Sequence, residues 1–135
     1  GARVKPLLDH EIGWFEIKRA DAARDHPLTA NWPDSETVLH WHGETFEMPE
    51  GATRLARSKA CRNQAFVYDD RVVGLQYHLE MRPEDIQRLV EWDGNEDRSG
   101  PYVQDRDEIL GAHRQSRRLL PRMNRLLDRL FNGQQ

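Results

Sequence analysis

The stretch GLQYHLE, residues Gly74–Glu80, ends a run of β-favouring residues with a histidine and, two positions later, a glutamate. A helical pattern follows at once. Pro83 suits a first helical position, and Ile86, Leu89 and Val90 recur at the spacing of one helix face. In α/β sheets, ligand and catalytic groups gather where strands end and helices begin. The stretch therefore predicts an α/β fold with a functional junction at its histidine and glutamate.

The sequence before this junction has the pattern of strands. Alternating apolar residues or β-favouring runs bounded by turn formers predict strands over residues 11–20, 38–46 and 51–58, and a hairpin over residues 64–78 that turns at Asp69-Asp70. Residues 21–37 carry Pro27 and Pro33 and predict a loop with one short helical turn.

The sequence after the junction is helical with one polar interruption. Residues 93–101, DGNEDRSGP, predict a break between the helix that begins at Pro83 and a second amphipathic helix over residues 105–131. Pro121 removes a backbone donor inside this second helix and is expected to kink or split it. The predicted helix over residues 105–131 contains many arginines, whose charge is partly offset by acidic residues. This composition favours a solvated helix face or a surface for a partner domain.

The composition argues against two classes of partner. The 20 Lys+Arg and 23 Asp+Glu give a net charge of −3, so nothing draws the whole chain to nucleic acid or to an anionic membrane. No apolar run is long enough to span a bilayer, and no signal-peptide pattern opens the chain. The single cysteine, Cys61, excludes an internal disulfide and is compatible with a reducing cytoplasm, the expected location.

His78 and Glu80 are candidates for acid–base chemistry. A histidine general base needs a second group that fixes its tautomer and stabilises the imidazolium, and a nearby carboxylate can do both. Taken alone the spacing is common, and a strand-end histidine beside a helix-flanking acid with no joint role explains it better.

The stretch HWHGETFEMPEG, residues 40–51, allows a different chemistry. Its strand period places His40 and His42 on one face and Trp41 on the other. Imidazole and carboxylate suit zinc, iron or manganese, so His40, His42, Glu47 and His78 form an alternative metal-binding set. The competing interpretation is a tight turn in which Gly43 lets the backbone approach a ligand closely.

Cys61 is a weak candidate for a nucleophile. Lys59 and Arg62 flank it, but no glycine-rich elbow or helix start follows, and an inert thiol is expected.

Four ordered motifs resemble one family. EIGW (residues 11–14), LHWHGETFEMPEGATRLARS (39–58), CRNQAF (61–66) and GLQYHLE (74–80) resemble the C-terminal half of class I glutamine amidotransferase domains, most of all the GMP-synthase-like subgroup. The resemblance implies a flavodoxin-like α/β fold with strands and a hairpin followed by C-terminal helices. It also implies a Cys–His–Glu triad in which His78 and Glu80 are the histidine and the glutamate. Trp41, His42, Gly43 and Glu44 match the loop whose backbone holds glutamine, and no metal or other cofactor is implied.

Two departures from the family pattern matter. Leu79 stands where the family usually has proline, which should leave both roles intact. The G-x-C-x-G elbow that carries the nucleophile is absent from the sequence, and GARV at the start resembles the strand that follows the elbow's helix. We therefore expect residues 1–92 to be the C-terminal half of the domain without its elbow, and residues 93–135 to be a polar loop and helical extension of that domain. An apolar fraction of 37% and a charged fraction of 32% suit a piece of a larger unit.

The expected parent is an enzyme that hydrolyses the side-chain amide of glutamine and passes ammonia to an acceptor, a synthase domain or subunit. The 135 residues alone are expected to be inactive, because the missing half would carry the cysteine. The alternatives are a γ-glutamyl peptide or amide hydrolase with the same fold, a metal-binding β-domain, and an inactive interaction domain.

Overall fold

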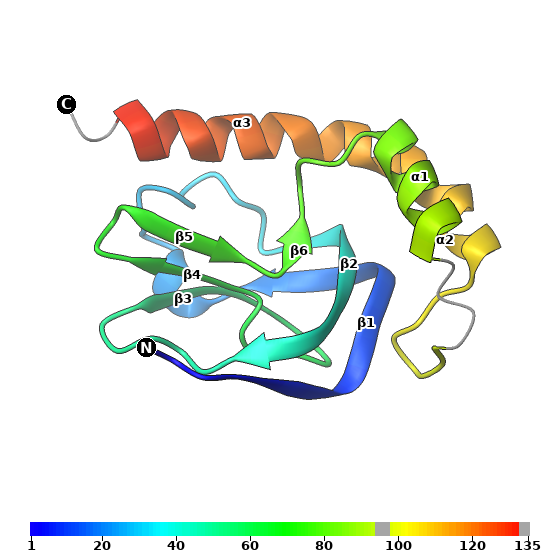
Figure 1. Cartoon of the computed structure of the whole chain (residues 1–135). Coiled ribbons are helices and arrows are strands. Elements are labelled where there is room, and N and C mark those ends of the chain that lie inside the picture. The colour runs from blue at the N-terminus through cyan, green and yellow to red at the C-terminus, as the bar shows by residue number, and fades with distance from the viewer. Residues whose placement is uncertain (94–97, 133–135) are drawn as a thin grey trace.

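A computed structural model describes residues 1–93 and 98–132 (Figure 1). Six strands form one sheet in the order β5-β4-β3-β1-β2-β6. The strands are β1 (Val4–Arg19), β2 (Ser35–Phe46), β3 (Thr53–Ser58), β4 (Ala65–Tyr68), β5 (Val72–Leu75) and β6 (Tyr77–His78). The helices are α1 (Pro83–Asp93), α2 (Arg106–Ala112) and α3 (Ser116–Asn132), with short 3₁₀ turns η1 (Asp21–Ala23) and η2 (His113–Gln115).

The sheet confirms the predicted strands and the order of strands before helices. Every pair of neighbouring strands in this sheet is antiparallel. The described residues thus form a mixed strand-and-helix fold. The parallel strands that a flavodoxin-like sheet requires are not among these residues. β1 begins at Val4, seven residues before the predicted start, because its first residues pair with the far end of β2 beyond a register shift between Pro6 and Glu11.

The hairpin predicted at Asp69-Asp70 is confirmed. β4 and β5 pair from Tyr68↔Val72 to Ala65↔Leu75, and the two aspartates between them have φ of 53° and 50°. Aspartate tolerates this left-handed region better than most residues, which suits it to a tight hairpin turn.

Three helices cover the sheet. α3 lies along one side of it, with α1 and α2 near the beginning of α3 (Figure 1). Leu119 and Leu126 of α3, Ile86 and Val90 of α1 and Ile109 of α2 join the strand residues in one core cluster. The C-terminal helices are therefore part of the same core as the strands. None of the helices in the described ranges is both long and apolar enough to cross a membrane.

The second helix differs from its prediction in where it is divided. The chain leaves the α-helix at η2, whereas Pro121 lies inside the continuous α3, so a split at Pro121 is wrong and a kink there stays a prediction. Trp14 Nε1 donates to the Ile109 carbonyl at 3.1 Å, and the His113 amide bonds to the Leu110 carbonyl in a 3₁₀ manner. A tertiary contact thus occupies the carbonyl that His113 would use in an α-helix. Of the predicted polar break, residues 94–97 lie outside the described part of the chain.

Candidate functional site

His78 and Glu80 meet at the predicted junction. His78 ends β6, the edge strand that pairs with β2, and the chain enters α1 at Pro83. His78 Nδ1 lies 2.7 Å from Glu80 Oε1, and Glu80 Oε2 accepts a hydrogen bond of 2.9 Å from the Leu79 amide. The side chains are 31% and 49% exposed, so a solvent-borne molecule can reach the pair.

Leu79 anchors this pair. Its side chain is buried in the core cluster while His78 and Glu80 on either side remain accessible. Partial burial raises the pKa of Glu80, but the hydrogen bond from His78 and the backbone donors, including the Leu79 amide, outweigh it, and the net shift is downward. The carboxylate is therefore ionised near neutral pH and can accept the Nδ1–H of His78.

Trp41, His42, Gly43 and Glu44 lie in the second half of β2, and their side chains point in different directions. Trp41 Nε1 donates to Asp93 Oδ2 at 2.5 Å, which links β2 to the end of α1. Arg98 holds the same carboxylate with two contacts of 2.9 and 2.7 Å. His42 lies on the opposite face of the strand, and Glu44 is exposed.

Gly43 has a close neighbour, as a glycine at a close approach should, and that neighbour is His10 of this chain. A Cβ at Gly43 would lie 2.8 Å from the His10 Nε2. Gly43 lies within β2, so the predicted tight turn is wrong, and the absence of a side chain here makes room for the His10 ring.

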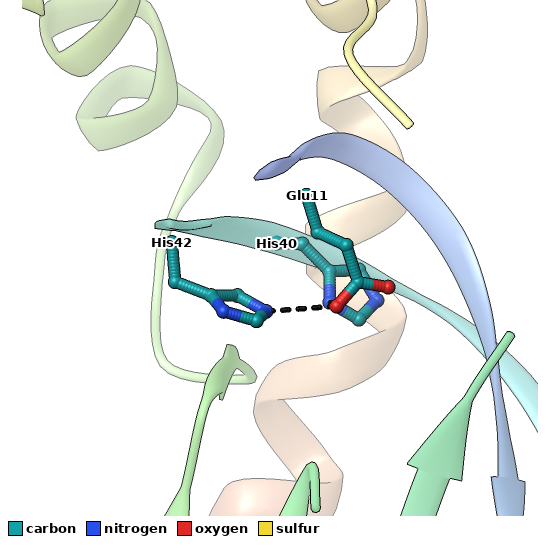
Figure 2. Close-up of side chains that lie close together, drawn as sticks. All are labelled: Glu11, His40 and His42. Carbon is teal, nitrogen blue, oxygen red and sulfur yellow. Dashed lines mark ion pairs between the residues drawn. The ribbon is translucent and has the colours of Figure 1, made fainter. Parts of the chain in front are cut away.

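A second group of polar residues lies between β1 and β2 (Figure 2). Glu11 is directly opposite His42 in the β1–β2 ladder, and His40 is two residues earlier on the same face. Glu11 Oε2 is 3.0 Å from His42 Nε2 and 3.8 Å from His40 Nδ1. The Glu11 and His40 side chains are buried, and that of His42 is 11% exposed. We call Glu11, His40 and His42 the β1–β2 cluster.

Electrostatics in the β1–β2 cluster are set by burial and by these short contacts. Burial raises the pKa of Glu11, but His42, His40 and Ser58 lower it by more, so the carboxylate is ionised. Burial lowers the pKa of His40 to about 4, a larger effect than the opposing attraction of Glu11. His40 is therefore neutral at pH 7.

The alternative metal set differs from the observed group. Among the residues described, Glu11 with His40 and His42 is the group whose ligand atoms all lie within 4.8 Å of one another. Glu47 lies elsewhere and pairs with Arg3 at 3.1 Å, and His78 pairs with Glu80. The sequence contained both strands, but the register that places Glu11 opposite His42 could not be read from it.

Cys61 has the surroundings of an inert thiol. It is buried, and its Sγ lies 3.2 Å from Thr45 Oγ1. Burial raises the pKa of the thiol, and the hydrogen bonds that it makes with Thr45, the Asn63 carbonyl and Gln76 only partly oppose this. A protonated, buried thiol is a poor nucleophile.

Comparison with known proteins gives one consistent group of relatives. No protein-family model matches the sequence. The chain is 35% identical over 91 residues to the glutamine amidotransferase-like protein YfeJ of Salmonella typhimurium, a match that covers 67% of this chain and 38% of that protein.

Solved structures of similar proteins agree with this relative. A glutamine amido transferase from Methylobacillus flagellatus is 28% identical, with a TM-score of 0.89 over 98% of this chain and 56% of its own. A glutamine amidotransferase from Thermotoga maritima is 32% identical, with a TM-score of 0.80 over 96% of this chain and 55% of its own. The chain thus spans little more than half the length of these structures and less of the curated relative.

Proposed function

Because the chain is class I glutamine amidotransferase-like in sequence and in fold, we propose that the whole protein hydrolyses the side-chain amide of glutamine and passes the ammonia to an acceptor. The observation that carries this proposal is the 2.7 Å contact between His78 Nδ1 and Glu80 Oε1 at an accessible strand end. The acceptor is a synthase domain or subunit, and the reaction takes place in the cytoplasm.

The geometry suits a histidine that moves protons. With Nδ1–H donated to Glu80, the tautomer leaves a basic Nε2 on the other side of the ring. In the proposed reaction His78 Nε2 takes the thiol proton of the cysteine, the resulting thiolate attacks the amide carbon, and His78 then gives this proton to the departing ammonia. His78 then takes a proton from the water that hydrolyses the thioester, while Glu80 orients the ring.

The nucleophile in this proposal is a cysteine outside the 135 residues. Cys61 is the single cysteine of the sequence, and it is buried with a raised pKa. By itself, therefore, the chain is proposed to be inactive, as the C-terminal part of a triad-bearing domain. The backbone at Trp41–Glu44 is proposed to hold the amino-acid end of glutamine, with His10 displaced from Gly43 or lying beside the ligand.

The test measures ammonia release from glutamine by the whole protein and by the 135-residue chain. We expect turnover by the whole protein, a loss of about 10²–10⁴-fold in kcat for His78→Ala, and a smaller loss for Glu80→Gln. The 135-residue chain should release no more ammonia than its own His78→Ala variant. Substrate profiling with γ-glutamyl amines separates an amidotransferase from a γ-glutamyl hydrolase of the same fold.

Two results would contradict the proposal. Ammonia release by the 135-residue chain that depends on His78 would show that no external cysteine is needed. Absence of any His78-dependent hydrolysis of glutamine in the whole protein would favour an inactive interaction domain.

A further inference from the structure

The β1–β2 cluster directs three potential ligand atoms at one point. Glu11 Oε2, His40 Nδ1 and His42 Nε2 lie within 4.8 Å of one another in the interior of the sheet (Figure 2). Within the described part of the chain, His40 Nδ1 has no hydrogen-bond partner, and the polar neighbour of His42 Nε2 is the Glu11 carboxylate at 3.0 Å. Buried polar atoms without partners cost free energy, so their convergence on a carboxylate needs a physical cause.

The far side of each ring indicates which nitrogen carries the proton. His40 Nε2 lies 3.3 Å from the Phe15 carbonyl, and His42 Nδ1 lies 2.9 Å from the Glu44 carbonyl. A carbonyl oxygen only accepts, so each of these nitrogens is the N–H donor. In the neutral ring the other nitrogen then carries a lone pair, and both lone pairs face Glu11 Oε2.

We propose that Glu11, His40 and His42 bind one divalent metal ion, zinc by preference, through Oε2, Nδ1 and Nε2. Two imidazoles and one carboxylate are a ligand set that suits zinc. Zinc bond lengths of about 2.1 Å place tetrahedral ligands about 3.4 Å apart. The separations from Oε2 of 3.0 and 3.8 Å lie on either side of that value, and the two imidazole nitrogens, within 4.8 Å of each other, must reach the same spacing when the site forms.

The groups around the cluster are those that support metal ligands. In zinc sites the second nitrogen of a ligating histidine is usually donated to a carbonyl or carboxylate, and the ligating carboxylate is itself hydrogen-bonded. Both histidines meet the first condition. Ser58 Oγ and Gln64 Nε2 meet the second, because each donates to a Glu11 oxygen at 2.5 Å.

A cavity of about 290 Å³ reaches Glu11, although neither histidine of the cluster lines it. Its other lining residues include Phe15, Tyr102, Glu16 and the cationic Lys18, Arg57 and Lys59. These three cationic side chains outnumber Glu16, so they favour water or an anion over a second cation as the fourth ligand. His78 and Glu80 are not among the proposed ligands, because they bond to each other.

The competing explanation is a proton in place of the metal. A protonated His42 would form an ion pair with Glu11, and the cluster would then be a structural network with no affinity for zinc. The two explanations predict different results when zinc is added to metal-free protein, whether or not the protein hydrolyses glutamine.

The experiment adds zinc to EDTA-treated protein and follows binding by calorimetry and by NMR of the imidazole nitrogens. We expect one equivalent to bind, and the nitrogen signals of His40 Nδ1 and His42 Nε2 to move. The signals of His26 should stay in place. The NMR measurement uses the unaltered protein, so it decides the question even if variants of buried residues fail to fold.

Matched variants test the ligand assignment. His42→Gln should weaken zinc binding by about tenfold or more, whereas His26→Gln should leave it unchanged. His26 is a fair control because it too is largely buried and contacts a carboxylate, Asp70, at 3.0 Å. No uptake by the unaltered protein, equal uptake by His42→Gln, or signal changes at other histidines alone would overturn the proposal.

Discussion

Ser58 Oγ donates a hydrogen bond of 2.5 Å to Glu11 Oε1, and this contact ties β3 to β1 through a fully buried carboxylate. Ser58 itself is held by the Cys61 amide, which donates to Ser58 Oγ at 2.9 Å. A buried carboxylate is tolerated only when donors replace the water it has lost. The hydroxyl at position 58 is therefore a structural requirement of the β1–β2 cluster.

Ser58→Ala should lower the free energy of unfolding of metal-free protein by about 1.5–3 kcal/mol, because one oxygen of an ionised, buried group loses a donor. Urea denaturation in EDTA measures this effect. Ser35→Ala is the matched control, since Ser35 lies exposed at the start of β2. Equal stability of the two variants would show that Ser58 contributes nothing beyond its side-chain volume.

Gly13→Ala should also destabilise the fold, by about 1–3 kcal/mol. Gly13 has φ of 124°, a backbone conformation that other residues rarely adopt, and the Gln104 side chain lies directly against it. Gln104 Oε1 also accepts from the Trp14 amide at 2.7 Å. A methyl group would therefore strain the backbone and displace this bridge between β1 and the segment before α2.

Gly111→Ala is the control for that prediction. Gly111 is exposed in α2 and no positive φ constrains it. Apart from its chain neighbours and the backbone of its own helix, no atom of the described residues lies within 4 Å of the position its Cβ would take. Alanine is the better helix former, so this variant should be equal to or more stable than the parent. Thermal unfolding of the two variants side by side decides whether backbone conformation and contact at Gly13 matter.

The local features of the fold could be predicted from the sequence. The hairpin at Asp69-Asp70 and the helix that begins at Pro83 depend on neighbouring residues, whose conformational preferences act over a few positions. The pairing of His78 with Glu80 is equally local, with two residues of separation.

The β1–β2 cluster could not be predicted, because it depends on strand register. Glu11 meets His42 only through the β1–β2 ladder, whose register shifts between Pro6 and Glu11. A register shift of one residue would place the Glu11 side chain on the other face of the sheet. The division at η2 was missed for a similar reason, since it follows from the bond of Trp14 to the Ile109 carbonyl 95 residues away.

Trp41→Phe tests whether this side chain serves the fold or the substrate. Phenylalanine keeps the ring but loses the bond from Nε1 to Asp93, so stability should fall by about 1.5–3 kcal/mol, the range for a hydrogen bond to a charged group. Only the backbone of this segment is proposed to hold glutamine, so the KM of the whole protein should change by less than about twofold. A large rise in KM at unchanged stability would assign the indole to the substrate.

Glu80 gives the protein a predictable dependence on pH. Its folded-state pKa is below the ordinary value, so its pairing stabilises the fold fully above the unfolded-state pKa of about 4.3. This stabilisation is lost as the pH falls through the lower, folded-state pKa. The difference in unfolding free energy between the parent and Glu80→Gln should therefore be constant between pH 5 and 6, roughly, and shrink as the pH falls below about 4.

Urea denaturation of the parent and of Glu80→Gln in EDTA across this pH range measures the difference in unfolding free energy. Contributions from groups that titrate alike in the two proteins cancel in this difference. Glu50→Gln is the control, because Glu50 is an exposed residue in the turn before β3. The control should follow the parent at every pH. If the difference for Glu80→Gln instead grew as the pH fell, the carboxylate would be stabilised in its protonated form. It could not then serve as the acceptor that orients His78.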